Sequence, residues 1–203
     1  EKEAPQYRVY VGMKHWHPFI SDTVRKIAED GVERLVALPL APHSSRMSTG
    51  AYRDSVDEAV ASLPSPMPVR HIESWHANPL YIEALVEKIR DSMKGISSPE
   101  TSNMEVVFSA HSLPRRILQW DDPYPRELQQ CSRAVAEAAG LPSWRFAYQS
   151  ASHTGEPWLG PDILETLADL ASQGREHVLV VPIGFVSDNL EILFDIDVEA
   201  QEL

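Results

Sequence analysis

Two groups of residues in this sequence have types and spacings that could carry chemistry. His111 follows the apolar run "VVFSA" and precedes Pro114 by three positions. An imidazole can accept a proton near neutral pH or bind a metal ion, although a histidine that only caps a strand by hydrogen bonding has the same local sequence. The second group is a row of carboxylates at spacings of three, four and four: Asp188, Glu191, Asp195 and Glu199. Proton transfer and metal binding are therefore the chemistries to consider.

The carboxylate row is predicted to lie along one side of a helix, because side chains three or four residues apart share a helix face. Like charges at this spacing cost about 0.2–0.5 kcal/mol per pair in an isolated helix, so such a row is unusual unless water or a cation offsets the repulsion. A solvated helix start, where the helix dipole favours acids, explains Asp188 and Glu191 but not Asp195 or Glu199. Both a hydrated helix and a cation-facing helix fit the pattern.

The elements that must hold these side chains alternate between predicted strands and predicted helices. Strands are expected over residues 7–13, 34–40, 68–74, 104–110, 144–150 and 177–185. Helices are expected from Pro18, near Tyr52, after Asn78, around 124–139 and from Pro161. This alternation predicts an α/β fold with parallel sheets and helices on both faces, and continuous apolar strands suit sheets that are buried on both sides.

A short linker divides this pattern into two halves. The stretch "GISSPETSN", residues 95–103, is small, polar and contains a proline, and the alternation of strand and helix restarts beyond it. We therefore predict two domains, over residues 1–98 and 99–203, with His111 and Glu191 in the second.

Ligands of parallel α/β folds bind at the carboxyl ends of the strands. Candidate residues that follow the predicted strands are Lys14, His15, Ser44, Ser45, Trp75 and His111. Polar residues are common at strand ends, so the same pattern fits a solvated Lys14 and a Trp75 that serves packing. Tyr52 begins an apolar helical row, which is typical of a core residue.

Composition excludes several classes of function. The net charge is -12 and the basic residues are scattered, which argues against a nucleic-acid partner. Cys131 is the single cysteine, so neither a disulfide nor a cysteine-bound iron–sulfur cluster is expected. No apolar run reaches the ~20 residues of a membrane helix and no secretory signal opens the chain, so a cytoplasmic location is expected. No Gly-x-Gly-x-x-Gly follows a predicted strand, which argues against a dinucleotide-binding oxidoreductase.

Several segments resemble the ferrochelatase family, in the family's order and over residues 7 to 199. They are "YVGMKHWHPFI", "SAHSLP", "YQS", "EPWLGPDI" and "PIGFVSDNLEILFDID". The resemblance implies two Rossmann-like chelatase domains around a cleft that binds a porphyrin, protoporphyrin IX or coproporphyrin III, into which ferrous iron is inserted. Iron is then a substrate, and no prosthetic group is expected. Family members are longer, and both their additional N-terminal βα segment and their C-terminal helix are expected to be absent here.

The resemblance also implies roles for individual residues. His111 corresponds to the family's active-site histidine and Glu191 to its partner glutamate. A free-base porphyrin loses two pyrrole protons when it takes up a divalent metal, which is a task for a base such as histidine. We expect the imidazole and the carboxylate to lie roughly 5–8 Å apart, since two groups bound to one metal each contribute a bond of about 2 Å. The resemblance makes the acidic row a metal route and implies substrate contacts at Lys14, His15, Ser44, Ser45, Tyr52 and Trp75.

One position departs from the family pattern. Asn189 stands where the family usually has a histidine, which puts a proton-relay or metal role there in doubt. Two alternatives to a ferrochelatase stay open. One is a noncatalytic relic that binds a tetrapyrrole or a metal, and the other is a chelatase that inserts cobalt or nickel into a reduced tetrapyrrole. Peripheral contact with a membrane is compatible with every one of these functions.

Overall fold

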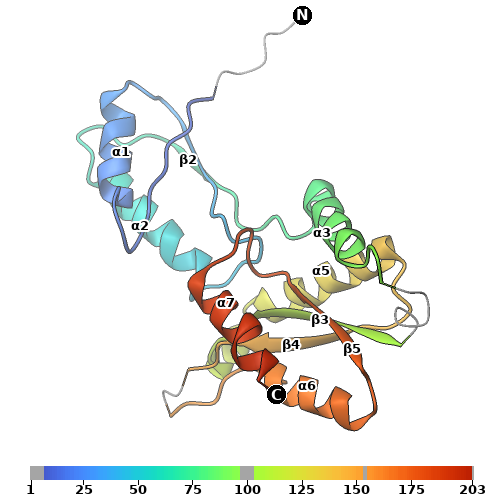
Figure 1. The fold of residues 1–203 in the computed structure, drawn as a ribbon. Helices are drawn as coiled ribbons and strands as arrows, with labels where there is room; N and C mark the ends of the chain where they lie inside the picture. Colours follow the sequence, from blue (N-terminus) through green and yellow to red (C-terminus); the bar gives the residue numbers. More distant parts are fainter. Residues whose placement is uncertain (1–6, 97–102, 153–154, 203) are drawn as a thin grey trace, which may run out of the picture. The chain divides into compact units, whose positions relative to one another are not determined.

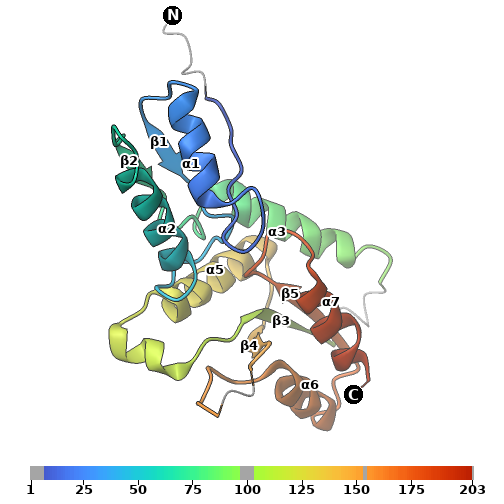
Figure 2. The same ribbon diagram turned by 90° about the vertical axis from the view of Figure 1, so that its left-hand side faces the viewer.

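The computed structural model describes residues 7–96, 103–152 and 155–202, which form two compact units. Unit 1 comprises Glu1–Pro39 and Arg46–Glu73, and unit 2 comprises Leu40–Ser45 and Ser74–Leu203. Each unit contains its own parallel sheet with helices packed on it (Figures 1 and 2).

Unit 1 is a two-stranded parallel sheet with two helices. Its elements are α1 (Ile20–Glu29), β1 (Leu35–Ala37), α2 (Thr49–Ala61) and β2 (Val69–His71). The register pairs Leu35 with Val69, and α1 and α2 lie side by side against the sheet (Figure 2). Its core is formed by Ile20, Val24, Ile27, Val60 and Met67. Apolar residues at helical spacing therefore pack together in the core of this unit, as the sequence predicts.

The strand that the sequence predicts over residues 7–13 is absent from the structure. This segment forms no ladder, and an isolated parallel bridge joins Met13 to Phe19. Alternate residues Tyr7, Val9 and Val11 are 76%, 89% and 63% exposed. The residue types favour an extended chain, but a strand also needs a partner for its backbone hydrogen bonds.

Unit 2 is a three-stranded parallel sheet in the order β4-β3-β5. Its strands are β3 (Met104–His111), β4 (Arg145–Gln149) and β5 (His177–Pro182). Its helices are α3 (Pro79–Ser92), η1 (Arg115–Trp120), α5 (Tyr124–Ala139), α6 (Ile163–Ser172), α7 (Leu190–Asp197) and η2 (Glu199–Gln201). In both views α3 and α5 lie on one side of the sheet and α6 on the other (Figures 1 and 2). Both faces of the central strand are thus covered, and β3 is buried from Glu105 to Ala110.

Local signals fix where the helices of unit 2 begin and end. The side chain of Asn78 accepts the amide of Leu80 at 3.0 Å, which caps α3 as predicted. The helix that was expected from Pro161 begins at Ile163 instead, because Asp162 accepts the amide of Leu164 at 2.8 Å and serves as the N-cap.

These parallel sheets flanked by helices confirm the predicted α/β class and are consistent with two Rossmann-like domains. The predicted boundary between residues 98 and 99 lies outside the described residues and stays a prediction. Helix α3, which precedes that boundary, packs against α5 within unit 2. In the described part of the chain, every helix is too short or too polar to cross a bilayer.

Candidate active site

The end of the central strand holds the candidate catalytic histidine. Strand β3 pairs with β4 as far as His111 opposite Gln149, and with β5 only as far as Ser109. Beyond the ladder, the amide of Ser112 donates to the carbonyl of Gln149 at 2.7 Å. His111 is therefore the first residue of β3 after its buried interior, at the carboxyl edge where α/β folds bind ligands.

Two contacts orient the imidazole of His111. Its Nδ1 lies 2.5 Å from the carbonyl oxygen of Ser112, and because a carbonyl only accepts, Nδ1 carries the proton. Its Nε2 lies 3.2 Å from Oε1 of Glu191. The two side chains are 29% and 51% exposed. In the neutral ring this tautomer leaves the lone pair on Nε2, so this atom can accept a proton or bind a metal.

The His111–Glu191 contact brings together the two residues that the sequence singled out, but at a shorter distance than expected. The predicted separation of roughly 5–8 Å assumed that both groups reach around a shared ion. In the structure they contact each other directly at 3.2 Å.

Helix α7 carries Glu191 in its first turn, and Asn189 is its N-cap. The side-chain oxygen of Asn189 accepts the amide of Ile192 at 3.1 Å. A carboxylate in the first turn is also favoured by the helix dipole. The residue that departs from the family pattern thus has a structural role, which is to begin the helix that presents Glu191.

The acidic row does not lie on a single helix, contrary to the prediction. Glu191 and Asp195 belong to α7, but Glu199 lies in η2, and Asp188 precedes the N-cap of α7. The carboxylate of Asp195 accepts a hydrogen bond from the hydroxyl of Ser150. Within the described residues, no group of three or more histidine, cysteine, aspartate or glutamate side chains is placed to hold a metal ion. The metal route therefore stays a prediction.

Two aromatic residues that the sequence did not assign lie beside His111. The hydroxyl of Tyr124 donates to the carbonyl of His111 at 3.0 Å. The Trp158 ring lies 6.4 Å from the His111 ring between centroids, tilted by 44°. Residues 157–159 reach this position by pairing antiparallel with residues 113–115, around a bridge between Pro114 and Trp158. These contacts join residues far apart in the chain, and only the proline-bounded "WLGP" run hinted at one of them.

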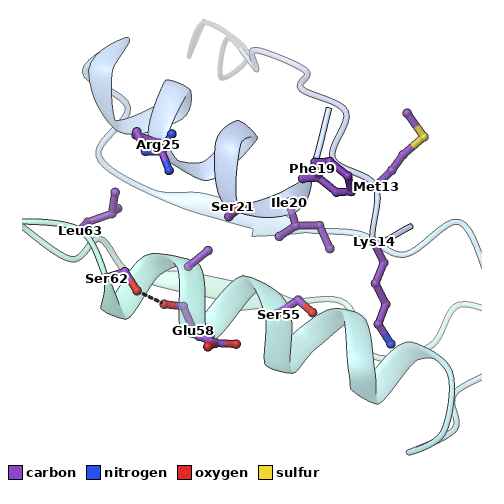
Figure 3. A pocket seen from close by; sticks show the side chains of 11 residues that line it. Met13, Lys14, Phe19, Ile20, Ser21, Arg25, Ser55, Glu58, Ser62 and Leu63 are labelled. Carbon is purple, nitrogen blue, oxygen red and sulfur yellow. Dashed lines mark hydrogen bonds between the residues drawn. The ribbon is translucent and has the colours of Figure 1, made fainter. Parts of the chain in front are cut away.

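In unit 1, the structure brings Lys14 and Tyr52 together. The ammonium of Lys14 lies 5.9 Å from the centroid of the Tyr52 ring, within cation–π range. Lys14 also lines a pocket of about 470 Å³ between α1 and α2. Lys14 and Arg25 stand at opposite ends of this pocket, and Glu58 lies between them (Figure 3). His15, next in the chain, is exposed.

The three predicted substrate residues of unit 2 are engaged within the protein. The amide of Ser44 donates to Glu127 Oε2 at 2.7 Å, and the hydroxyl of Ser45 donates to Asp122 at 3.2 Å. The Trp75 ring packs edge-on against the Tyr81 ring, with centroids 5.0 Å apart. Ser45 is only 1% exposed, so its position favours a structural role over contact with substrate.

The sequence of this chain is similar to those of known ferrochelatases. A model of the ferrochelatase family matches residues 1–203. The chain is 47% identical to a ferrochelatase of Herpetosiphon aurantiacus, over 97% of this chain and 64% of that protein. It is 43% identical to a ferrochelatase of Thermus thermophilus, over 96% of this chain and 61% of that protein. It is 38% identical to a coproporphyrin III ferrochelatase of Anoxybacillus flavithermus, over 98% of this chain and 63% of that protein.

The chain thus spans less than two thirds of the length of these relatives. The match nevertheless runs through every described element of both units, and it includes the strand end and the helix that bring His111 to Glu191. The chain belongs to the ferrochelatase family.

Proposed function

We propose that this protein inserts ferrous iron into a porphyrin, protoporphyrin IX or coproporphyrin III, in haem biosynthesis. Membership of the family supports this proposal, as do the names of its relatives, which are ferrochelatases and coproporphyrin III ferrochelatases. The observation that carries it is the 3.2 Å contact between Nε2 of His111 and Oε1 of Glu191 at the carboxyl edge of the sheet.

In this proposal His111 accepts a proton that the porphyrin releases. Insertion replaces two pyrrole N–H bonds by bonds to the metal, so two protons must leave for each iron that enters. Because Nδ1 donates to the Ser112 carbonyl, the lone pair of Nε2 is free to take one of them. The imidazolium that results is stabilised by Glu191, and the second proton passes to the carboxylate or to water.

The carboxylates of this site would meet the incoming ferrous ion. A hydrated divalent cation must lose water before a macrocycle can bind it, and oxygen ligands can replace that water. Glu191 is half exposed and Asp195 lies one helical turn further along α7. We propose that this pair, with Asp188 and Glu199 at the two ends of the helix, guides iron towards His111.

The porphyrin contacts in unit 1 are proposed on charge. A porphyrin bears propionate groups, and Lys14 offers an ammonium beside the aromatic ring of Tyr52. We retain four further residues as weaker candidates for substrate contact, namely His15, Ser44, Ser45 and Trp75. The proposed reaction needs neither a resident prosthetic group nor a nucleic acid. We expect the protein to work in the cytoplasm, and peripheral contact with a membrane is compatible with this location.

The noncatalytic relic stays an alternative, because the cap that Asn189 makes on α7 serves a catalytic and a noncatalytic protein equally well. An anaerobic assay with ferrous iron and each porphyrin, followed by absorbance, separates the alternatives. A chelatase converts the porphyrin spectrum with turnover, a relic binds porphyrin without conversion, and an enzyme for reduced tetrapyrroles leaves both porphyrins unchanged.

Two substitutions test the roles of the pair. His111→Ala should abolish insertion while porphyrin still binds, because the proton acceptor is lost and the macrocycle contacts remain. Glu191→Gln should be nearly as severe, because it removes the charge with little change of shape. His177→Ala, at the opposite end of the same sheet, is the matched control. If either test variant keeps more than about a tenth of the wild-type rate, that group supplies less than ~1.4 kcal/mol and is not central.

A further inference from the structure

We infer that Tyr124 is a positioning residue for His111, and that its buried hydroxyl replaces the backbone donor which β5 no longer supplies at the end of β3. The inference deepens the proposed function and rests on it for its kinetic readout. It concerns a residue that contacts neither porphyrin nor iron in the proposal and acts through the backbone of the histidine.

The backbone around His111 shows why a donor is needed there. On the β5 side, the last ladder bond is donated by the amide of Ile183 to the carbonyl of Ser109 at 2.8 Å. Carbonyls of alternate residues in a strand point to the same side, so the His111 carbonyl faces the side that β5 has left. The hydroxyl of Tyr124 donates to this carbonyl at 3.0 Å.

The bond from Tyr124 fixes the peptide plane on which the imidazole depends. The His111–Ser112 peptide is held on one side by Tyr124, and on the other by the amide of Ser112, which donates to Gln149 at 2.7 Å. The ring itself donates from Nδ1 to the carbonyl of Ser112. Rotation of this peptide would therefore turn the ring and change the position of Nε2 relative to Glu191. A misplacement of about 1 Å can lower the rate up to ~100-fold.

Tyr124 is itself held rigidly enough for this role. It is the first residue of α5, it is 7% exposed, and its amide donates to Asp122 at 3.1 Å. The His43 ring meets its ring edge-on at 6.3 Å between centroids, and the His76 ring stacks on the His43 ring at 5.7 Å. Burial raises the pKa of the Tyr124 phenol far above its ordinary range, so the hydroxyl stays a donor throughout the working pH range.

A tyrosine that only filled the core would act through its ring alone, and Tyr124→Phe separates the two roles. The variant keeps the ring against His43 and removes only the oxygen that holds the His111 carbonyl. Tyr10→Phe is the matched control, because it deletes a tyrosine hydroxyl that donates to Asp30 at 2.8 Å in unit 1. Thermal unfolding is measured for both, so that rates are compared on folded protein.

We expect Tyr124→Phe to lower kcat about three- to tenfold, the size of one neutral hydrogen bond, while the KM for porphyrin changes less than twofold. A second readout needs no turnover. In nitrogen-15 NMR, the Nδ1–H proton of His111 should exchange with water at least about tenfold faster in this variant, since a mobile peptide weakens the bond to Ser112. Tyr10→Phe should match the wild type in kcat and in exchange.

Each other outcome overturns the positioning role. An unchanged kcat with unchanged exchange makes Tyr124 core material, and an equal fall of kcat in Tyr10→Phe makes the effect general. Failure of Tyr124→Phe alone to fold makes the hydroxyl an element of stability. If the wild type inserts no iron, the proposed function fails, while the exchange of the His111 Nδ1–H proton still decides whether Tyr124 positions the ring.

Discussion

At the scale of single residues, a buried histidine that stays neutral at physiological pH packs behind the unit 2 site. His43 is 2% exposed, and within the described residues neither of its ring nitrogens has a hydrogen-bond partner. Burial, and then the nearby His76, lowers its pKa from 6.5 to about 3. The ring is therefore neutral at physiological pH, and it packs as an aromatic ring against both Tyr124 and His76.

This burial predicts acid sensitivity. In the unfolded chain His43 takes up a proton below about pH 6.5, whereas in the folded chain it does so only near pH 3. The stability that it contributes is thus complete above pH 6.5 and is lost as the pH falls towards 3. By pH 4.5 the loss from this group is about 3 kcal/mol.

His43→Leu should therefore reduce the fall in unfolding free energy between pH 7 and pH 4.5 by a few kcal/mol, as measured by urea titration at each pH. His177→Gln, at the start of β5, should leave the fall as large as in the wild type. A His43→Leu curve parallel to that of the wild type would mean that the buried ring accepts a proton without penalty.

At the scale of elements, the start of α7 determines where Glu191 lies. Asn189→Ala removes the side-chain oxygen that accepts the Ile192 amide and should destabilise the protein by about 1 kcal/mol. Backbone amides of the first turn should also exchange faster with deuterium. Asn189→Asp keeps the cap and is the matched control. Equal protection of these amides from exchange in the two variants would mean that the side chain of residue 189 does not stabilise the start of α7.

The carboxylates of α7 and η2 make a second prediction at this scale. Replacing Asp195 by Asn and Glu199 by Gln together should weaken the apparent affinity for ferrous iron more than that for porphyrin. Added salt should reproduce part of the loss in the wild type, because exposed charges are screened over about 8–10 Å. Steady-state kinetics against both substrates measure this. If only the dependence of the rate on porphyrin concentration changed, these carboxylates would be no more than hydrated groups on the helix surface.

At the scale of the whole molecule, local patterns predicted the elements well and their partners poorly. The β3 interior, the cap at Asn78 and the positions of the helices follow from the spacing of apolar residues and from capping chemistry. The strand over residues 7–13 failed because strand formation depends on a neighbour that no local pattern reveals. The row on α7 failed because the helix ends at Asp197, before Glu199.

The candidate site divides in the same way. His111 drew notice as a strand end and Glu191 as part of an acidic row, but only the resemblance to a family paired them, and the structure places them in contact. Tyr124 was missed because its role depends on the carbonyl of a residue 13 positions away, at a strand edge that exists only in three dimensions. Trp158 was missed because antiparallel pairing with 113–115 brings it to the histidine. Contacts that cross between elements have no periodic signature.

The segment Leu40–Ser45 belongs to unit 2 although the chain on both sides of it belongs to unit 1. It donates hydrogen bonds to two carboxylates much later in the chain: the amide of Ser44 donates to Glu127, and the hydroxyl of Ser45 donates to Asp122. During synthesis these serines leave the ribosome long before either acceptor exists. These contacts of unit 2 can therefore form only after the chain has been made as far as Glu127. A fragment that begins at Ser74 would lack both serine donors, so the two carboxylates would lose these hydrogen bonds.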